Sequence, residues 1–400
     1  MNQSEYTFVT PRPKRRGWLK KTLIAMASVV GLVFALLGGG YVYLTTTLNA
    51  AGIDVYGSDG EQFTLPTAEE INGPINILLV GSDTRAGQGS TAYGPSTAEL
   101  ADVIILIHVS QDRSNAVAVS FPRDLMISVP PCPNPDGGER FPAKDLVQIN
   151  ATMNTGGPAC TLVAIQALTG VQIPYLAMID FKGVIAMSEV VGGVNVCVAE
   201  DINDPKTNLY LEAGEHSLVG DQALAFLRTR YGVGDGSDLS RISNQQVFLT
   251  SLVRKLKDEG VLSNPFKMLR VGTAALENMT LSKSLTNIGV MLGMAREVNQ
   301  VDIDMITFLK LPVYSMTGAN SGRVALIEDK ADFLFQKIAN DEPLILAKAN
   351  PGSGAVVADD TTASTEGSAT PAEEASTSPE AEPLPDWVQG TKASVKSCSK

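Results

Sequence analysis

Residues 101–109 read ADVIILIHV, an apolar run that is rich in β-branched side chains and too short for most helices. A run of this kind predicts a strand covered on both faces, because a strand with one face in water alternates apolar and polar residues. Comparable runs recur along the chain, and each is expected to form a strand. They are INILLV at 75–80, NAVAVSF at 115–121, PYLAMIDF at 174–181, VNVCV at 194–198 and VDIDMITFL at 301–309.

Amphipathic helical patterns lie between and after these runs. They occupy residues 159–169, 182–191, 219–230, 239–258, 264–276, 283–296 and 324–340. Strands interleaved with helices are typical of α/β proteins, in which helices cover the faces of a sheet. We therefore expect residues 73–345 to form a three-layer α/β/α domain with a central, mostly buried mixed sheet.

The composition is that of a folded, acidic protein. Of the 400 residues, 44% are hydrophobic and 18% charged, which suffices for a sizeable core and excludes a wholly disordered chain. The net charge of −12 would repel a phosphate backbone, so we expect no nucleic-acid partner. The chain has two histidines. It contains no HExxH, no GxSxG and no GxxxxGK followed by Ser or Thr, so the sequence does not support a zinc metalloprotease, a serine hydrolase or a P-loop nucleotide-binding protein.

The beginning of the chain has the pattern of a membrane anchor. Residues 23–44, LIAMASVVGLVFALLGGGYVYL, carry no charge, and as a helix they would span about 33 Å, the thickness of a bilayer core. The positive-inside rule then predicts a single-pass protein of the cell membrane, with residues 1–21 cytoplasmic, 22–44 transmembrane and the remainder outside. The basic residues that set this orientation are Lys14, Arg15, Arg16, Lys20 and Lys21. A cleaved signal peptide is the alternative, although its apolar region is normally only about 7–15 residues long.

Two segments flank the predicted domain. Residues 45–72 are expected to form a stalk or small accessory element, and residues 346–400, rich in Ser, Thr, Pro and acids, a disordered tail. All cysteines follow the predicted anchor, where disulfides persist. They are Cys132, Cys160, Cys197 and Cys398. The sequence leaves three pairings open, and zinc binding is a poor alternative because the chain has no CxxC pair.

Two aspartates lie near the ends of predicted strands. Asp83 and Arg85 belong to the segment GSDTR directly after the first strand, and Asp102 opens the next one. The end of a strand in an open α/β sheet is a common place for a ligand site. Carboxylates from neighbouring strands suit Mg²⁺ when a phosphorylated substrate supplies the remaining ligands. The alternative, favoured by spacing alone, is that Asp83 caps a turn and that Asp102 is a solvated strand end.

Arginines gather in several short segments. The third strand runs into FPRD, and the helical pattern 219–230 ends in RTRY. Asp238, Arg241 and Gln245 follow at helical spacing and fall on one face. Guanidinium groups bind phosphate oxygens in bidentate fashion, so their convergence would suit a diphosphate. The residues concerned are Arg85, Arg123, Arg228, Arg230 and Arg241. Scattered surface arginines are the alternative.

The order of these segments is more specific than any one of them. GSDTR, AD before an apolar strand, SFPRD, QINATMNTGG, DFKGVIAMSEVVGGVNV, LVGDQALAFLRTR and DLSRISNQQ together resemble the LytR-CpsA-Psr family over residues 73–310, with cysteine spacing similar to actinobacterial members. The resemblance implies an envelope protein with one transmembrane anchor. It also implies transfer of a glycopolymer from a polyprenyl-diphosphate carrier to a hydroxyl of a cell-wall acceptor, usually peptidoglycan.

Residue roles follow from the resemblance. It implies that Asp83 and Asp102 hold Mg²⁺ and provide the base. Diphosphate binding would fall to Arg85, Arg123, Arg228, Arg230, Arg241 and Gln245, of which Arg123 and Arg228 are also implied in catalysis, with Asp238 supporting Arg241. One departure is Gln148, where the family often has lysine. The family also implies an apolar cavity for the lipid, which the patterns 161–168 and 246–253 could line. The alternative, favoured by the residues alone, is that these apolar helix faces are plain core.

Two other functions remain as alternatives. One is a carrier that holds polyprenyl-diphosphate lipids without turnover, although paired acids beside arginines favour turnover. The other is an envelope-linked transcriptional attenuator, against which the acidic body and the short cytoplasmic arm argue. The cargo implied by the actinobacterial resemblance is arabinogalactan, a capsule-like polysaccharide or a glycoprotein glycan.

Overall fold

The computed structural model describes residues 52–57, 61, 71, 73–83, 99–358 and 383–400. The chain divides into two compact units, residues 1–50 and 51–400, and every described residue belongs to the second. The predicted arm and anchor, 1–44, therefore lie outside the described residues. Within the described part of the chain, no helix combines the length and the apolar character needed to cross a bilayer.

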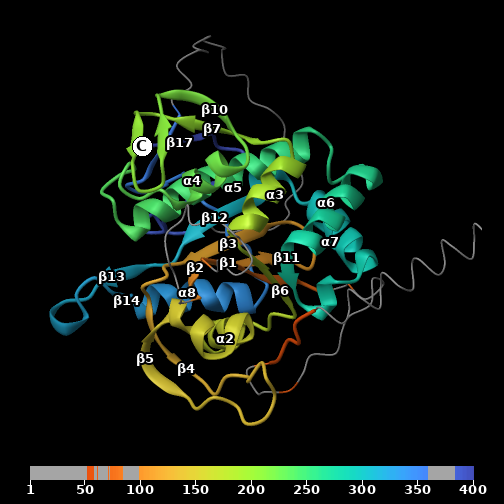
Figure 1. Ribbon diagram of the computed structural model, residues 1–400, viewed down its shortest axis with the longest axis vertical. Helices are drawn as coiled ribbons and strands as arrows, with labels where there is room; N and C mark the ends of the chain where they lie inside the picture. Colours follow the sequence, from red (N-terminus) through yellow and green to blue (C-terminus); the bar gives the residue numbers. More distant parts are fainter. Residues whose placement is uncertain (1–51, 58–60, 62–70, 72, 84–98, 359–382) are drawn as a thin grey trace, which may run out of the picture. The chain divides into compact units, whose positions relative to one another are not determined.

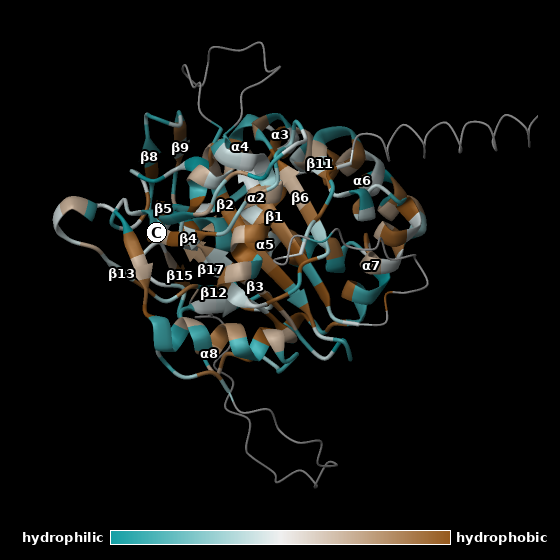
Figure 2. Cartoon of the chain, turned by 90° about the horizontal axis from the view of Figure 1, so that it is seen from below, coloured by the Kyte–Doolittle hydropathy of each residue, from teal (hydrophilic) through white to brown (hydrophobic). Residues whose placement is uncertain are grey.

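A seven-stranded mixed sheet forms the centre of this unit, in the order β11-β6-β1-β2-β3-β12-β16. The strands are β1 (Ile75–Ser82), β2 (Ala101–Val109), β3 (Ala116–Phe121), β6 (Tyr175–Ile179), β11 (Met279–Leu281), β12 (Ile306–Lys310) and β16 (Gly390–Lys392). The β1–β6 and β3–β12 pairs are parallel, and the other pairs are antiparallel. The predicted strands at 75–80 and 101–109 are confirmed, and both are buried on both faces. Figure 2 shows β1 and β6 largely in the brown of apolar residues.

Helices cover both faces of the sheet, which confirms a layered mixed α/β fold (Figure 1). In Figure 1, α2 (Thr152–Thr169) and α8 (Glu328–Ala339) lie below the sheet. The other helices lie above the sheet or to its right in Figure 1: α3 (Phe181–Val190), α4 (Asp221–Arg228), α5 (Asp238–Asp258), α6 (Pro265–Asn278) and α7 (Ile288–Gln300). One apolar core lies on each face, with Leu78 and Leu106 facing α2 and α8, and Ile75 and Ile105 in the opposite core.

The strand predicted at 194–198 is present but does not belong to the central sheet. It is β7 (Val194–Val198), in a separate four-stranded sheet of order β10-β7-β17-β15. Its valines are buried while Asn195 is exposed, so it has the alternation of a strand with one solvated face. The partners of β7 are β10 (Gly214–Leu218), β15 (Ala355–Val357) and β17 (Ser397–Ser399).

The expected disordered tail over 346–400 is wrong at both of its ends. β15 and β17 pair with each other in the second sheet, and β16 adds a strand to the edge of the central sheet beside β12. Leu384 and Val388 are buried in the core that contains α8. Burial of these apolar side chains and the disulfide between Cys197 and Cys398 hold this segment on the body. Residues 359–382 lie outside the described residues.

Smaller elements complete the body. They are β4 (Met126–Val129) with β5 (Lys144–Gln148), β8 (Ile202–Asp204) with β9 (Leu209–Leu211), and β13 (Val313–Ser315) with β14 (Val324–Leu326), together with short 3-10 turns at Ile149–Ala151, Lys283–Leu285, Ile303–Met305 and Gly318–Asn320. The second disulfide joins Cys132 to Cys160, so of the three pairings that the sequence left open the structure has one. Residues 52–57, expected to belong to a stalk or small accessory element, pack on the body, where Val55 is buried in the core.

Candidate active site

The predicted site residues come to one edge of the central sheet. β1 ends at Ser82, and β2, which runs antiparallel to it, begins at Ala101, so Asp83 and Asp102 flank the paired residues Ser82 and Ala101. β3 runs antiparallel to β2 and ends at Phe121, which places Arg123 at the same edge. Asp83, Asp102 and Arg123 are separated in the sequence but lie at the same edge because adjacent strands run in opposite directions.

The first turn of α5 adds two more charges to this edge. Ser237 caps the helix by accepting a hydrogen bond from the amide of Ser240, and Asp238 and Arg241 follow one turn apart. The Arg241 Nη2 lies 2.6 Å from the Asp238 Oδ1 and donates a hydrogen bond of 2.9 Å to the backbone oxygen of Asp102. The structure thus brings Asp238 to Arg241, the pairing that the resemblance implied.

Arg123 completes an alternating cluster of charges. Its Nη1 lies 2.6 Å from the Asp102 Oδ1, and its Nε lies 3.3 Å from the Asp238 Oδ1. Asp124 approaches the same Nε at 3.7 Å. Burial acts to lower the pKa of the Arg123 guanidinium, but the three carboxylates around it raise that pKa overall. The side chain is therefore a fixed cation at every pH of interest.

Arg241 is the most buried charge of the cluster. Its side chain is only 5% exposed, and desolvation lowers its pKa, against the opposing effect of Asp238. The positive charges of Arg123 and Arg230 act in the same direction as desolvation, which shows that the three guanidinium groups lie within electrostatic range of one another. The buried guanidinium of Arg241 is thus attracted by Asp238 and Asp102 and repelled by two neighbouring cations.

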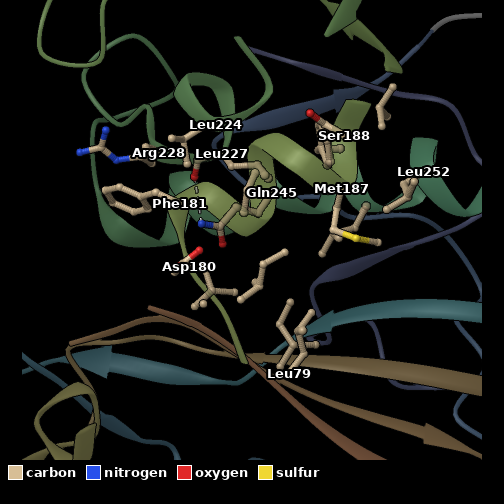
Figure 3. Close-up of a pocket in the computed structure, with 18 of the residues that line it drawn as sticks. Leu79, Asp180, Phe181, Met187, Ser188, Leu224, Leu227, Arg228, Gln245 and Leu252 are labelled. Atoms are coloured by element: carbon tan, nitrogen blue, oxygen red, sulfur yellow. Dashed lines mark hydrogen bonds between the residues drawn. The ribbon is translucent and has the colours of Figure 1, made fainter. Parts of the chain in front are cut away.

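An apolar cavity of about 290 Å³ opens beneath the cluster. Asp102, Arg228, Arg241 and Gln245 contribute to its wall at this end, while the rest is lined almost wholly by apolar side chains from β1, β2, β6 and helices α3 to α6. Figure 3 shows Leu79 on the sheet side of the cavity, with helix residues such as Met187, Leu224 and Leu252 across from it.

Arg228, the last residue of α4, stands at the polar end of this cavity. Its guanidinium carbon lies 4.3 Å from the centre of the Phe181 ring, which is a cation–π arrangement (Figure 3). Gln245 donates a hydrogen bond of 3.1 Å to the backbone oxygen of Leu227, which fixes its amide beside Arg228. Phe181 was not singled out in the sequence, and its position directly before the helical pattern 182–191 gave no sign of this contact.

The remaining sequence-predicted residues are less tightly joined. Arg230 lies two residues beyond Arg228, with its guanidinium carbon 5.9 Å from the Tyr231 ring centre, and it does not line the cavity. Arg85 lies outside the described residues. Gln148 donates a hydrogen bond of 2.8 Å to the Asp124 Oδ1, so the amide that replaces lysine orients an acid that itself faces Arg123.

The two helical patterns proposed for the cavity wall have different outcomes. Phe248, Leu249 and Leu252 from 246–253 line the cavity. Residues 161–168 belong to α2 and pack in the core on the opposite face of the sheet, so they are plain core and do not line the cavity. Apolar periodicity shows that a helix face is buried but cannot show against which side of the sheet it packs.

The donor set at Asp83 and Asp102 suits Mg²⁺. Both groups are carboxylates, the oxygen ligands that this ion prefers, and the Asp83 Oδ1 is oriented by a hydrogen bond of 2.8 Å from the amide of Leu100. Among the described residues, no third acid, histidine or cysteine joins them in a metal-binding group. Mg²⁺ typically uses only one or two protein carboxylates and takes further ligands from substrate phosphates and water, so two acids fit it.

The fold and this site define a class of protein, an α/β domain with charged groups of both signs at the mouth of a deep apolar cavity. The chain belongs to the LytR_cpsA_psr family, whose model matches residues 41–337. This match confirms the family that the ordered motifs indicated.

Individual relatives agree with this assignment. The chain is 27% identical over 322 residues to the cell wall biosynthesis protein LcpA of Corynebacterium glutamicum, a match that covers 74% of this chain. It is 25% identical over 256 residues to the polyisoprenyl-teichoic acid–peptidoglycan teichoic acid transferase TagT of Bacillus subtilis, covering 62% of this chain and 74% of that one. The chain spans 60% of the length of LcpA and 48% of that of LcpB, a probable cell wall biosynthesis protein of the same organism.

Solved structures show the same fold. The crystal structure of TagV from Bacillus subtilis matches with a TM-score of 0.53 at 20% identity, covering 68% of this chain and 97% of that one. The LytR-Csp2A-Psr enzyme from Actinomyces oris matches with a TM-score of 0.51 at 23% identity, covering 72% of this chain and 95% of that one.

Proposed function

We propose that this protein is a membrane-anchored, extracytoplasmic phosphotransferase that moves a glycopolymer from a polyprenyl-diphosphate carrier to a hydroxyl of the cell wall, with peptidoglycan as the acceptor. The observation that carries the proposal is the apolar cavity with Arg228 and Arg241 at its polar end. A molecule that joins a long hydrocarbon to a diphosphate has the matching division of apolar and anionic parts. The names of relatives as cell wall biosynthesis proteins and teichoic acid transferases support the same class of reaction.

The proposed site works mainly by position and charge, as is general for phosphoryl transfer. The cavity holds the hydrocarbon, and the arginines orient the diphosphate and offset its charge. The acceptor oxygen bonds to the phosphorus that carries the glycan, the bond from that phosphorus to the bridging oxygen breaks, and polyprenyl phosphate leaves. The hydroxyl proton passes to Asp83 or Asp102. Mg²⁺ held by these two carboxylates would supply Lewis-acid stabilisation of the phosphate charge.

The anchor is part of this proposal. Residues 23–44 are long and apolar enough to span a bilayer, and the five bases before them favour a cytoplasmic N-terminus. That orientation would place the site on the outer side of the cell membrane, where both the lipid carrier and the cell wall are accessible.

The test uses the full chain in detergent with a polyprenyl-diphosphate-linked glycan and a peptidoglycan fragment. We expect Mg²⁺-dependent release of polyprenyl phosphate, lost in EDTA, and a polyprenyl phosphate co-purified with the protein by mass spectrometry. Arg228→Ala should lower the rate by about 100-fold or more, the usual effect of removing a group that stabilises transition-state charge. Arg296→Ala, at an exposed arginine of α7 remote from the cluster in sequence, is the matched control and should transfer at the wild-type rate.

The carrier alternative has a distinct outcome in the same experiment. A protein that binds the donor but releases no polyprenyl phosphate, with or without Mg²⁺, would be a lipid carrier and would contradict the transferase proposal. The variant Asp83→Asn tests the role of the metal separately from the binding of lipid. We expect this variant to keep the co-purified lipid and to need more Mg²⁺ for the same rate.

A further inference from the structure

The N-terminal half of α6 has an exposed surface that the proposed reaction does not use. Phe266 is 83% exposed and Leu269 is 44% exposed, and their i, i+3 spacing places them on one face. Among the described residues, these are the only two strongly exposed large hydrophobic side chains that share a turn of helix. An exposed apolar pair of this kind is a candidate contact surface for another protein or a membrane.

The start of α6 is held in place, which fixes the positions of Phe266 and Leu269. Pro265 occupies the first turn of α6, and the Asn264 side chain accepts hydrogen bonds from the amides of Phe266 and Lys267. Met268 is buried on the inner side of the same turn. The helix end is thus fixed to the body while Phe266 points away from it.

The charges around the pair are positive. Lys267 and Arg270 are exposed between and beside the two apolar side chains, and residues 260–276 contain no Asp or Glu although the chain carries 43 acids in total. The nearest preceding acid, Glu259, is paired with Lys255 at 3.0 Å. Large apolar side chains interleaved with Lys and Arg are the pattern of a helix that lies in the headgroup layer of an anionic bilayer.

The space beneath this surface leads toward the candidate active site. A second apolar cavity of about 120 Å³ lies between α5, α6 and α7, and Leu269 contributes to its wall. Leu256 and Val271 line both this cavity and the larger one below the arginine cluster. The two cavities therefore adjoin each other at these side chains, beneath α6.

The chain that follows the predicted anchor joins the body beside β11, the strand that directly follows α6. The Ile53 amide bonds to the backbone oxygen of Leu281, and the Lys283 amide bonds to that of Ile53, just before α7 begins at Ile288. Residue 52 is eight residues from the end of the predicted span at 44. Eight residues reach at most about 28 Å, so an anchored span limits how far this region can move from the bilayer.

We propose that the surface formed by Pro265, Phe266, Lys267, Leu269 and Arg270 docks into the anionic headgroup layer of the membrane. The proposal rests on the membrane-anchored function given above. Phe266 and Leu269 insert among the upper acyl carbons, and the two cations contact lipid phosphates.

The test measures membrane contact directly in the full chain reconstituted into vesicles. Phe266→Trp places a fluorophore on the surface, and Tyr314→Trp is the matched control. Tyr314 is 54% exposed on β13, which lies across the body from α6 in Figures 1 and 2. Emission is recorded in vesicles of phosphatidylglycerol with brominated or ordinary acyl chains, and the wild-type signal of Trp18 and Trp387 is subtracted.

We expect bromination to quench the tryptophan at position 266 at least threefold more than the one at 314. Lys267→Glu with Arg270→Glu should reduce this quenching at least twofold, as should replacement of phosphatidylglycerol by phosphatidylcholine. Equal quenching at the two positions, or quenching that ignores both charge changes, would overturn the proposal. So would a blue shift at 266 that grows with protein density in unbrominated vesicles, which would assign the surface to a second copy of the chain. The measurement needs neither donor nor acceptor, so failure of the transferase proposal would leave its result readable.

Discussion

Arg123 and Asp102, separated by 21 residues in the sequence, form an ion pair with 2.6 Å between Nη1 and Oδ1 at the edge of the central sheet. Asp238 lies between Arg123 and Arg241 and contacts both. Each acid thus orients the cations that face a bound diphosphate in the proposed reaction. Because the charges share partners, a change at one of them should alter the geometry of the others.

Asp238→Ala should destabilise the fold strongly. It removes the closest carboxylate from the buried guanidinium of Arg241, and the unpaired charge should lower the free energy of unfolding by about 3 kcal/mol. Urea unfolding at pH 7 measures the change. The double variant Asp238→Leu with Arg241→Met is the control, because it removes both charges and should recover most of the loss. A single variant as stable as wild type would show that Asp102 alone suffices for Arg241.

Phe181→Leu should weaken transfer while keeping the cavity apolar. The ring lies under the guanidinium of Arg228, and loss of about 1.4 kcal/mol of cation–π attraction corresponds to about tenfold in binding or rate. Steady-state kinetics of donor turnover would measure it. Phe248→Leu also replaces a ring in the cavity wall, but no cation among the described residues lies over that ring, so its effect should be several-fold smaller. Equal losses in the two variants would contradict a role for the ring in holding Arg228.

Lys310→Met should remove a pH-dependent part of the stability. Lys310 is buried on β12 with its Nζ donating to the Ser243 Oγ, and desolvation lowers its pKa from 10.5 to about 8. Between these two values the unfolded chain binds a proton that the folded chain does not, so folding becomes more favourable as pH rises. The stability that depends on the neutral amine is lost as pH falls from about 10.5 to about 8.

The measurement compares urea unfolding of wild type and Lys310→Met at pH 7.5 and 9.5. The wild type should gain about 2 kcal/mol relative to the variant over this interval. The difference between the proteins cancels the titration of other lysines and tyrosines. A constant difference at the two pH values would show that Lys310 keeps its ordinary affinity for protons.

Serine at both Cys197 and Cys398 should destabilise the second sheet. The disulfide joins residues 201 positions apart, and removal of such a bond typically costs about 2–5 kcal/mol. Thermal unfolding without reductant measures the loss. Replacement of residues 359–382 by a Gly/Ser linker of equal length is the matched control, and we expect it to leave the melting temperature unchanged. A large loss in that control would assign those residues a structural role.

The sequence predicted the central layers well because their strands carry strong local signals. ADVIILIHV at 101–109 is β2 to the residue, and the pattern at 239–258 is α5 within one residue. The strands at 390–392 and 397–399 have three residues each and lie in a polar segment, so their pairing depends on β12 and β7 rather than on their own composition. VNVCV lies in the second sheet because it alternates buried valines with more exposed residues, the pattern of a strand with one solvated face.

The candidate site could be predicted only in part. The acids and arginines were found from the ordered motifs, and the structure brings Asp102, Arg123 and Arg241 together. The stacking of Arg228 on Phe181 joins two elements far apart in the chain, which no local pattern reports. The cavity wall also could not be identified, since a residue facing a lipid cavity and a residue packed in a core have the same apolar character.

The positions of β16 and β17 determine when during folding the two sheets can be completed. Both sheets gain a strand from residues 390–399, which are synthesised after β12 and β7 have already left the ribosome. The nascent polypeptide therefore carries open sheet edges until those residues emerge, and such edges invite pairing with other chains. These edges stay open to wrong partners until residues 390–399 have paired with β12 and β7, wherever the chain folds.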